Sequence, residues 1–267
     1  MSDLELVISD GIARLIINRP SRKNALSSEM WAEIPLLLKE ASGVRALAIQ
    51  SATAGVFSAG ADINEYRENA GNAEWGFESQ ARIGRAFSAL RAFEAPTFAL
   101  VDGPCFGGGA GIASACDFRI ATESATFAIT PTKLGMLYPY EEMVHLVDLV
   151  GVTVAKRILY SGATFTASWA LRVGFVDDVV ADSDLYKSFD ARIADLAVVS
   201  AAAVRNTKKM FARITSGVRV EDEIARAAIV EALESADHLE GLNAFLERRQ
   251  AKFSDYYRAD FLAKDLS

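Results

Sequence analysis

Three consecutive glycines, Gly107, Gly108 and Gly109, follow a short apolar segment, Thr97 to Val101, that is typical of a buried strand. Glycine lets another molecule approach the backbone closely. If a helix begins at these glycines, its first N–H groups have no partner within the helix and lie at the positive end of its dipole. The turn could therefore hold an oxygen atom that carries negative charge.

A second turn of small residues, FSAGADI from Phe57 to Ile63, follows another predicted strand, Val44 to Ser51. Two backbone N–H groups, one from each turn, could bind the same oxyanion, which is how enolates and tetrahedral intermediates of acyl chemistry are stabilised. A glycine-rich turn by itself is equally consistent with a plain turn. The prediction of a site therefore rests on the two turns together.

The elements that must position these turns follow an α/β pattern. Strands and helices recur along the first half of the chain, as expected where helices cross back over a sheet. The predicted elements there are strands 4–8 and 12–18, a helix from about Ser27 to Ala41 that Pro35 should kink, strand 44–51, a helix from about Trp75 to Phe93, strand 97–101, the glycine-led helix, and strands 118–121 and 125–129.

The second half of the chain is mostly helical. The predicted elements there are helices 152–160 and 166–172, a strand at 176–180, and helical patterns at about 184–198, 200–216 and 221–249. Gly174 should end the second helix and the last pattern breaks near His238. Amphipathic periodicity fits either a cap on one molecule or a surface between subunits. We divide the chain into a core, 1–200, and a C-terminal helical region, 201–267.

Composition narrows the class of protein. The chain has 267 residues, 51% of them hydrophobic, which is enough for one large domain or one large and one small domain. Its net charge of −7 argues against a nucleic-acid or anionic-membrane surface. Cys105 and Cys116 have small or apolar neighbours, so we expect buried thiols rather than a disulfide or a metal site. With no signal-peptide pattern and no long apolar run, we expect a cytoplasmic protein that does not span a membrane.

Seven segments resemble the enoyl-CoA hydratase/isomerase (crotonase) family, in the family's order and over most of the chain. They are Asn18-Arg19-Pro20, Asn24-Ala25-Leu26, FSAGADI, the glycine block up to Asp117, Leu134-Gly135, FTASWALRVGFVDDVV (165–180) and EGLNAFLERRQAKF (240–253). The resemblance implies a spiral of ββα units whose C-terminal helical region, 201–267, serves oligomerisation and active-site capping. It also implies a role in acyl-CoA metabolism, an acyl-CoA substrate with no separate cofactor, and a homotrimer or a dimer of trimers.

By this resemblance, the two oxyanion donors are the backbone N–H groups of Ala61 and Gly108, with the thioester carbonyl between them. Main-chain donors need no side chain, which suits such small residues. Asp62 is expected to fix the turn through local backbone bonds, and Tyr66 to line the acyl pocket. The other substrate contacts implied near the thioester are Ala25, Ala59, Ile63, Gly107, Gly111 and Pro131.

The nucleotide end of coenzyme A has its own implied contacts. Arg22 and Lys23 lie in the segment that resembles the family's adenine-binding loop, and Arg248, with Phe245 nearby, matches a position that reaches a neighbouring subunit's ligand. Asn64 stands where a lysine is common, so one phosphate contact is missing. Surface salt bridges or solubility would explain the arginines equally well.

The chain departs from the hydratases of this family at two positions. Their two catalytic glutamates correspond here to Gly111 and Pro131, and neither residue can transfer a proton. Hydration of an enoyl-CoA by two glutamates is therefore not expected.

One segment, FAITPTKLGMLY (127–138), instead resembles methylmalonyl-CoA decarboxylase and its relatives, and Tyr138 matches their tyrosine. Decarboxylation needs no general base, because CO2 leaves as the oxyanion site stabilises the enolate and a hydroxyl or water then protonates the carbon. The decarboxylase's histidine in the first turn is Ala61 here, which removes a partner of the substrate carboxylate.

A relocated carboxylate offers another source of acid and base. Glu141, or its neighbour Glu142, could replace the missing glutamates, although we favour the simpler interpretation that both are first-turn residues of a helix that face solvent. His145 lies among apolar residues and is expected to pack rather than to catalyse.

Two functions remain open from the sequence. The first is an acyl-CoA lyase or isomerase that uses the oxyanion site with Tyr138 or Glu141, and the second is a non-catalytic family member that binds acyl-CoA. A serine hydrolase is disfavoured because the chain contains no G-x-S-x-G. A dinucleotide-binding enzyme is disfavoured because the glycines at 107–111 lie deep in the chain and lack an acidic residue about 20 positions later.

Overall fold

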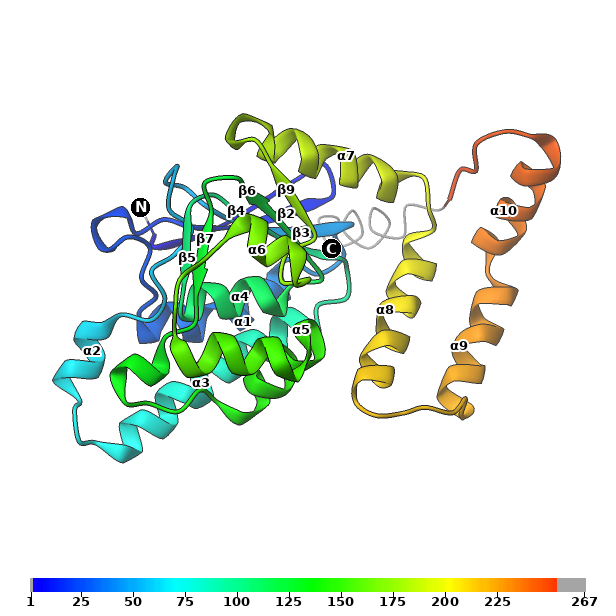
Figure 1. Cartoon of the computed structure of the whole chain (residues 1–267). Helices are drawn as coiled ribbons and strands as arrows, with labels where there is room; N and C mark the ends of the chain where they lie inside the picture. The colour runs from blue at the N-terminus through cyan, green and yellow to red at the C-terminus, as the bar shows by residue number, and fades with distance from the viewer. Residues whose placement is uncertain (1, 254–267) are drawn as a thin grey trace, which may run out of the picture.

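The computed structural model describes residues 2–253, and its centre is a six-stranded sheet (Figure 1). The first two strands form an antiparallel hairpin, and every later neighbour in this sheet is parallel. Parallel neighbours require crossover connections, which the helices supply. In spatial order the strands are β1 (Leu4–Ser9), β2 (Ile12–Ile17), β3 (Ala46–Ser51), β4 (Thr97–Val101), β6 (Phe118–Thr122) and β9 (Asp178–Val180).

A second sheet of three short strands carries the glycine turn. Its strands are β5 (Pro104–Phe106), β7 (Thr126–Ala128) and β8 (Phe165–Thr166). β5 runs parallel to β7, and β8 runs antiparallel to it. The glycine-led helix begins two residues after β5, so this small sheet sets where its N-terminus lies.

Helices cover both faces of the large sheet (Figure 1). The core helices are α1 (Ser28–Glu40), α2 (Ile63–Glu68), α3 (Ala73–Arg91), α4 (Gly108–Ala115), α5 (Tyr140–Ser161), α6 (Ala167–Arg172) and α7 (Leu185–Ala197), with 3-10 turns η1 (Pro20–Arg22), η2 (Pro131–Leu134) and η3 (Asp182–Asp184). Ser27 caps α1 by accepting a hydrogen bond from the Met30 N–H. α1 runs through Pro35 as one helix.

The apolar core has two parts. The larger one fills the space between the large sheet and α1, α3, α4 and α5, while α7 covers the opposite face. On that face the rings of Phe98 and Phe189 pack edge to face with centroids 5.3 Å apart. Both cysteines are free and buried, as expected, and burial raises the pKa of the Cys116 thiol to about 12.

The C-terminal helices α8 (Ala201–Thr215), α9 (Glu223–Glu234) and α10 (Ala236–Glu247) stand beside the core rather than on it (Figure 1). Large apolar side chains on them are exposed: Phe211, Ile214, Ile224, Ile229, Val230, Leu233, Leu239, Leu242, Phe245 and Leu246. The last residues of the predicted C-terminal region, 254–267, lie outside the described residues. No helix within residues 2–253 is long and apolar enough to cross a membrane.

The α/β class and most predicted elements are confirmed, but one predicted helix differs in its bounds. The helix predicted at 152–160 is the second half of α5, which starts at Tyr140 and bends at Gly151, whose backbone is non-helical (φ 76°, ψ 155°). The break predicted near His238 in the 221–249 pattern is confirmed and falls at Ser235, where the hydroxyl caps α10 by accepting from the His238 N–H. The structure does not test the division at residue 200, which stays a prediction.

Candidate active site

The FSAGADI turn presents one backbone amide, that of Ala61, which makes no hydrogen bond within the described residues. Ala61 forms a parallel bridge with Leu26, in which the Leu26 N–H donates to Gly60 O (2.7 Å) and the Asp62 N–H donates to Leu26 O (2.9 Å). These bonds flank Ala61, so its own N–H points away from Leu26. Among residues 2–253, no acceptor pairs with the Ala61 N–H.

The glycine turn presents a second free amide. β5 is joined to the FSAGADI turn by a bond from the Phe106 N–H to Ser58 O (2.8 Å). The Gly107 N–H donates to Ala128 O (2.7 Å), and α4 then begins at Gly108. Because Gly108 is the first helical residue, its N–H has no intrahelical acceptor, and none is found elsewhere in the described chain.

The backbones of the two turns touch, and glycine makes this contact possible. Gly60 has a φ of +96°, and a Cβ there would lie 2.8 Å from Phe106 O and 3.0 Å from Gly108 N. A Cβ on Gly108 would lie 3.5 Å from Ala61 N and 2.7 Å from Cζ2 of Trp31. The amide nitrogens of Ala61 and Gly108 therefore belong to turns in direct backbone contact.

The loop before α1 holds the first turn in place. Asn24 is fully buried and its side-chain amide donates to Phe57 O (3.2 Å), while the Ser58 hydroxyl donates to Asn24 O (2.7 Å). The Ala59 N–H donates to Lys23 O (3.0 Å), so the backbone of the segment that resembles an adenine-binding loop is bonded to the FSAGADI turn. The side chains of Arg22 and Lys23 remain exposed.

Asp62 fixes the turn, as predicted. Its carboxylate caps α2 by accepting from the Asn64 N–H (3.0 Å) and pairs with the Arg19 guanidinium (2.8 Å). Burial raises the pKa of this carboxyl, but the hydrogen bonds from Arg19 and Asn64 outweigh burial and hold it below its usual value. An ionised carboxylate with these bonds already made is an anchor rather than a proton carrier.

No side chain fits at the first glutamate position of the hydratases. A Cβ on Gly111 would lie 2.3 Å from Cζ of Phe87 on α3. The Phe87 ring is held there by Trp31, whose ring meets it edge to face with centroids 5.4 Å apart. The second position, Pro131, is the first residue of η2. The Phe87 ring therefore occupies the space that a side chain at position 111 would need.

We expect that Gly111→Glu does not create hydratase activity and lowers the free energy of unfolding by about 1–3 kcal/mol, because the new side chain must displace the Phe87 ring. Denaturant unfolding measures the free energy of unfolding, and the decrease in enoyl-CoA absorbance measures hydratase activity. Gly76→Ala is the matched control, since Gly76 is also helical but has open space around its Cβ position. A Gly111→Glu variant as stable as the wild type would contradict the packing argument.

Tyr138 and the buried ion pair between Glu142 and Arg91 form a cluster of titratable side chains. Tyr138 is buried, and burial together with the nearby Glu142 carboxylate raises the pKa of its hydroxyl above the usual value. Glu142 is 2% exposed and accepts hydrogen bonds from Arg91 on α3 at 3.1–3.3 Å. Glu141, the carboxylate selected from the sequence, is exposed instead, because the first turn of α5 points it outward. The buried carboxylate next to Tyr138 is Glu142.

The remaining predicted contacts fall into two groups. The first group lies at or beside the FSAGADI turn: Ala25 on the loop before α1, Ala59 in the turn itself, and Ile63 and Tyr66 on α2. The Tyr66 hydroxyl hydrogen-bonds to Ser79 on α3 (3.2 Å). By contrast, the structure does not bring Phe245 and Arg248 to these turns within one molecule. They lie at the end of α10, away from α4 (Figure 1), and Phe245 is 83% exposed.

Sequence reasoning missed three residues of this region: Trp31, Phe87 and Arg91. Each lies on an amphipathic helix, where its position in the apolar stripe predicts burial but not its neighbour. An arginine at the C-terminal end of a helix is ordinarily explained by the helix dipole. No sequence signal pairs Arg91 with a glutamate 51 residues later.

Comparisons with known proteins agree on one family. The family model described as "Enoyl-CoA hydratase/isomerase" matches residues 7–256. The enoyl-CoA hydratase domain-containing protein 2 of Bos taurus is 33% identical over 257 residues, covering 92% of this chain and 85% of the relative. The crotonyl-CoA hydratase of Syntrophomonas wolfei is 33% identical over 251 residues, covering 91% and 94%. The bovine relative is named as mitochondrial, so a cytoplasmic location stays a prediction for this chain.

Solved structures give the same result. A crystal structure of an enoyl-CoA hydratase/isomerase family protein from Hyphomonas neptunium superposes with a TM-score of 0.92 at 36% identity, covering 96% of this chain and 98% of that chain. The predicted crotonase-like α/β fold with C-terminal helices is thereby confirmed. The chain belongs to the enoyl-CoA hydratase/isomerase family.

Proposed function

We propose that this protein binds an acyl-CoA thioester with its carbonyl oxygen between the N–H groups of Ala61 and Gly108, and stabilises the enolate that forms there. The observation that carries this proposal is the pair of unpartnered backbone amides in two turns whose backbones touch. Such donors are fixed before the substrate arrives, so they need no reorganisation when charge develops on the oxygen. Membership of the family supports a thioester as the ligand.

The reaction that fits these residues is decarboxylation or isomerisation, not hydration by two glutamates. Gly111 and Pro131 cannot move protons, and the Phe87 ring fills the space at Gly111. In a decarboxylation the bond from the α-carbon to the carboxylate breaks, CO2 leaves, and the electron pair enters the enolate held by the two amides. One proton must then reach the α-carbon.

Tyr138 is our candidate for the proton donor. Because burial and Glu142 raise the pKa of its hydroxyl, the group stays protonated at neutral pH and can give a proton but not remove one. Solvent restores the proton afterwards. An isomerisation would need a base as well, and Glu142, whose pKa is raised by burial, is the buried carboxylate beside Tyr138. Glu141 would have to act from an exposed position.

Tyr138→Phe tests this role. We expect turnover of the accepted thioester to fall about tenfold or more, with the dissociation constant for coenzyme A unchanged, because only the hydroxyl is lost. The substrate is first found with a panel of malonyl-, methylmalonyl-, enoyl- and aryl-substituted CoA thioesters, and turnover and binding are then measured for both proteins. Unchanged turnover would remove Tyr138 from the mechanism.

The same panel tests whether the protein is an enzyme. Tight binding of coenzyme A thioesters without turnover of any of them would favour the alternative, a non-catalytic acyl-CoA-binding member of the family. The unpartnered amides would then serve binding only.

We also propose a homotrimer or a dimer of trimers, with Arg22 and Lys23 at the nucleotide end of the substrate and Phe245 and Arg248 covering a neighbouring subunit's ligand. The exposed apolar side chains of α8–α10 support an interface, since patches of that extent are uncommon on monomers. Light scattering of the purified protein is expected to give three or six times the chain mass. A monomer at micromolar concentration would contradict the assembly.

A further inference from the structure

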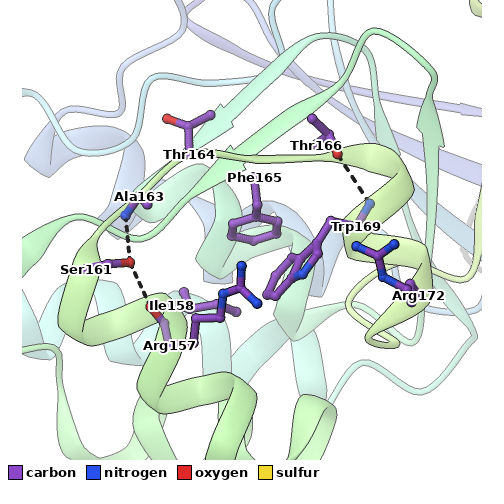
Figure 2. A pocket seen from close by; sticks show the side chains of 9 residues that line it. All are labelled: Arg157, Ile158, Ser161, Ala163, Thr164, Phe165, Thr166, Trp169 and Arg172. Atoms are coloured by element: carbon purple, nitrogen blue, oxygen red, sulfur yellow. Dashed lines mark hydrogen bonds between the residues drawn. The ribbon is translucent and has the colours of Figure 1, made fainter.

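A pocket lies where α5 ends and α6 begins, remote in sequence from the FSAGADI turn and the glycine turn (Figure 2). Its volume is about 320 Å³. The rings of Phe165 and Trp169 form its apolar wall, with centroids 4.9 Å apart and planes inclined by 64°. The Arg157 guanidinium lies over the Trp169 ring, 5.0 Å from its centroid, and Arg172 stands on the far side of that ring in Figure 2.

Neither arginine has an acidic partner among residues 2–253. No ion pair or side-chain hydrogen bond is found for the guanidinium of Arg157 or Arg172 within the described part of the chain, and no acidic residue lines the pocket. This is unusual in a chain whose net charge is −7. A guanidinium stacked on an indole keeps its N–H donors at the edge, where they can bind an anion.

The hydroxyl groups around the pocket are mostly committed to its own turns. Ser161 Oγ accepts from the Ala163 N–H (3.1 Å) and donates to Arg157 O (2.7 Å), which closes the end of α5, and Thr166 Oγ1 accepts from the Trp169 N–H (3.3 Å). The hydroxyl of Thr164 makes no hydrogen bond to residues 2–253. It is the hydroxyl left to contact a ligand.

The apolar wall is anchored to the core, so the pocket is formed in advance. The Phe165 ring stacks on Phe127 (centroids 5.6 Å apart) and meets Phe175 edge to face (5.4 Å), and both of those rings are fully buried. Ile158 is 2% exposed beneath the arginine. A pocket with a fixed aromatic wall requires little ordering when a ligand binds.

We infer that this pocket binds a small planar anion: one aromatic or heteroaromatic ring that carries a phosphate or a carboxylate. The ring would pack against Phe165 and Trp169, and the anionic group would take the free donors of Arg157 and Arg172. The volume is at the lower end of the range for ligand pockets, so it suits one ring system with its charged group and not a whole coenzyme A molecule. This site is separate from the proposed thioester site and does not depend on it.

Calorimetric titration of the full-length protein with phenyl phosphate and, in parallel, with benzoate tests the site and identifies the preferred anion. Two controls are titrated in the same way: inorganic phosphate, which has the charge without the ring, and phenol, which has the ring without the charge. We expect one of the two aromatic anions to bind about tenfold tighter than either part, because the ring and the charge are recognised together.

Arg157→Gln is the variant that locates the binding. The side chain is exposed and makes no ion pair within residues 2–253, so the fold should survive, and the dissociation constant should rise about tenfold. Arg85→Gln removes another exposed arginine, on α3, and should leave binding unchanged. Three results would overturn the inference: no binding of either aromatic anion, equal binding by Arg157→Gln, or weakening only by Arg22→Gln. A change in oligomeric state of Arg157→Gln would also overturn it, since a second copy would then occupy the pocket.

Discussion

Ala61→Pro is expected to lower turnover of the accepted thioester by about 10²–10³, the cost of removing one donor from an oxyanion hole. Proline has no N–H, and its ring would place a carbon where the Ala61 amide hydrogen points. The substitution removes no hydrogen bond within the described protein, because the Ala61 N–H has no acceptor there. The residue before it is Gly60, which has no Cβ to clash with the proline ring.

Ala61→Ser is the matched comparison. It changes the side chain at the same position but keeps the N–H, so we expect it to lose far less turnover than the proline variant. Thermal unfolding should be similar for the two proteins, and binding of coenzyme A, which has no acyl carbonyl, should survive in both. Turnover of Ala61→Pro close to that of Ala61→Ser would show that the amide is not a donor, and the proposed function would then fail.

The contact between the two turns could be predicted from the sequence because it depends on residues with one physical property. Gly60 and Gly108 admit the close approach of two backbones, and small neighbours such as Ala61 keep the space open. The hydrogen bonds of Asn24 and Asp62 are also of a kind that a sequence can indicate, since short polar side chains near a strand end satisfy local backbone groups. The local chemistry of the turns therefore follows from the chain itself.

What surrounds the turns could not be predicted, because it depends on contacts between residues far apart in the chain. Nothing in the α3 sequence says that Phe87 fills the space beside Gly111. The choice between Glu141 and Glu142 depends on about 100° of helix rotation, which is set by how α5 packs against α4 and reaches Arg91 on α3. A sequence assigns such residues to a helix, but only the packed fold assigns them to a site.

The ion pair between Arg91 and Glu142 leads to the largest expected loss of stability. Arg91→Leu leaves a carboxylate that is 1% exposed without its partner, and we expect the free energy of unfolding to fall by about 3–5 kcal/mol at about pH 8. In the intact protein, burial raises the pKa of Glu142 above its usual 4.5 and the Arg91 hydrogen bonds oppose that rise. Without Arg91 these hydrogen bonds are lost, so the pKa of Glu142 rises further.

The loss should shrink toward about pH 5, and its direction follows from proton linkage. A carboxyl whose folded pKa lies above its unfolded pKa binds more protons in the folded state, so its contribution to stability falls as pH rises between the two values. His145 also titrates near this pair, and burial and Arg91 lower its pKa. Repeating the measurement in a His145→Gln background separates the two groups.

Denaturant unfolding of Arg91→Leu, Glu142→Leu and the double variant completes the test. The double variant buries no unpaired charge, so it should be more stable than Arg91→Leu alone at about pH 8. Glu142→Gln should cost less than Arg91→Leu, because the amide oxygen still accepts from the guanidinium without a charge to desolvate. If Arg91→Leu lost the same free energy at both pH values and the double variant recovered none of it, then Arg91 would stabilise the fold by packing alone. A loss that does not change with pH would contradict the raised pKa of Glu142, and Glu142 would then lose its place as the candidate base of an isomerisation.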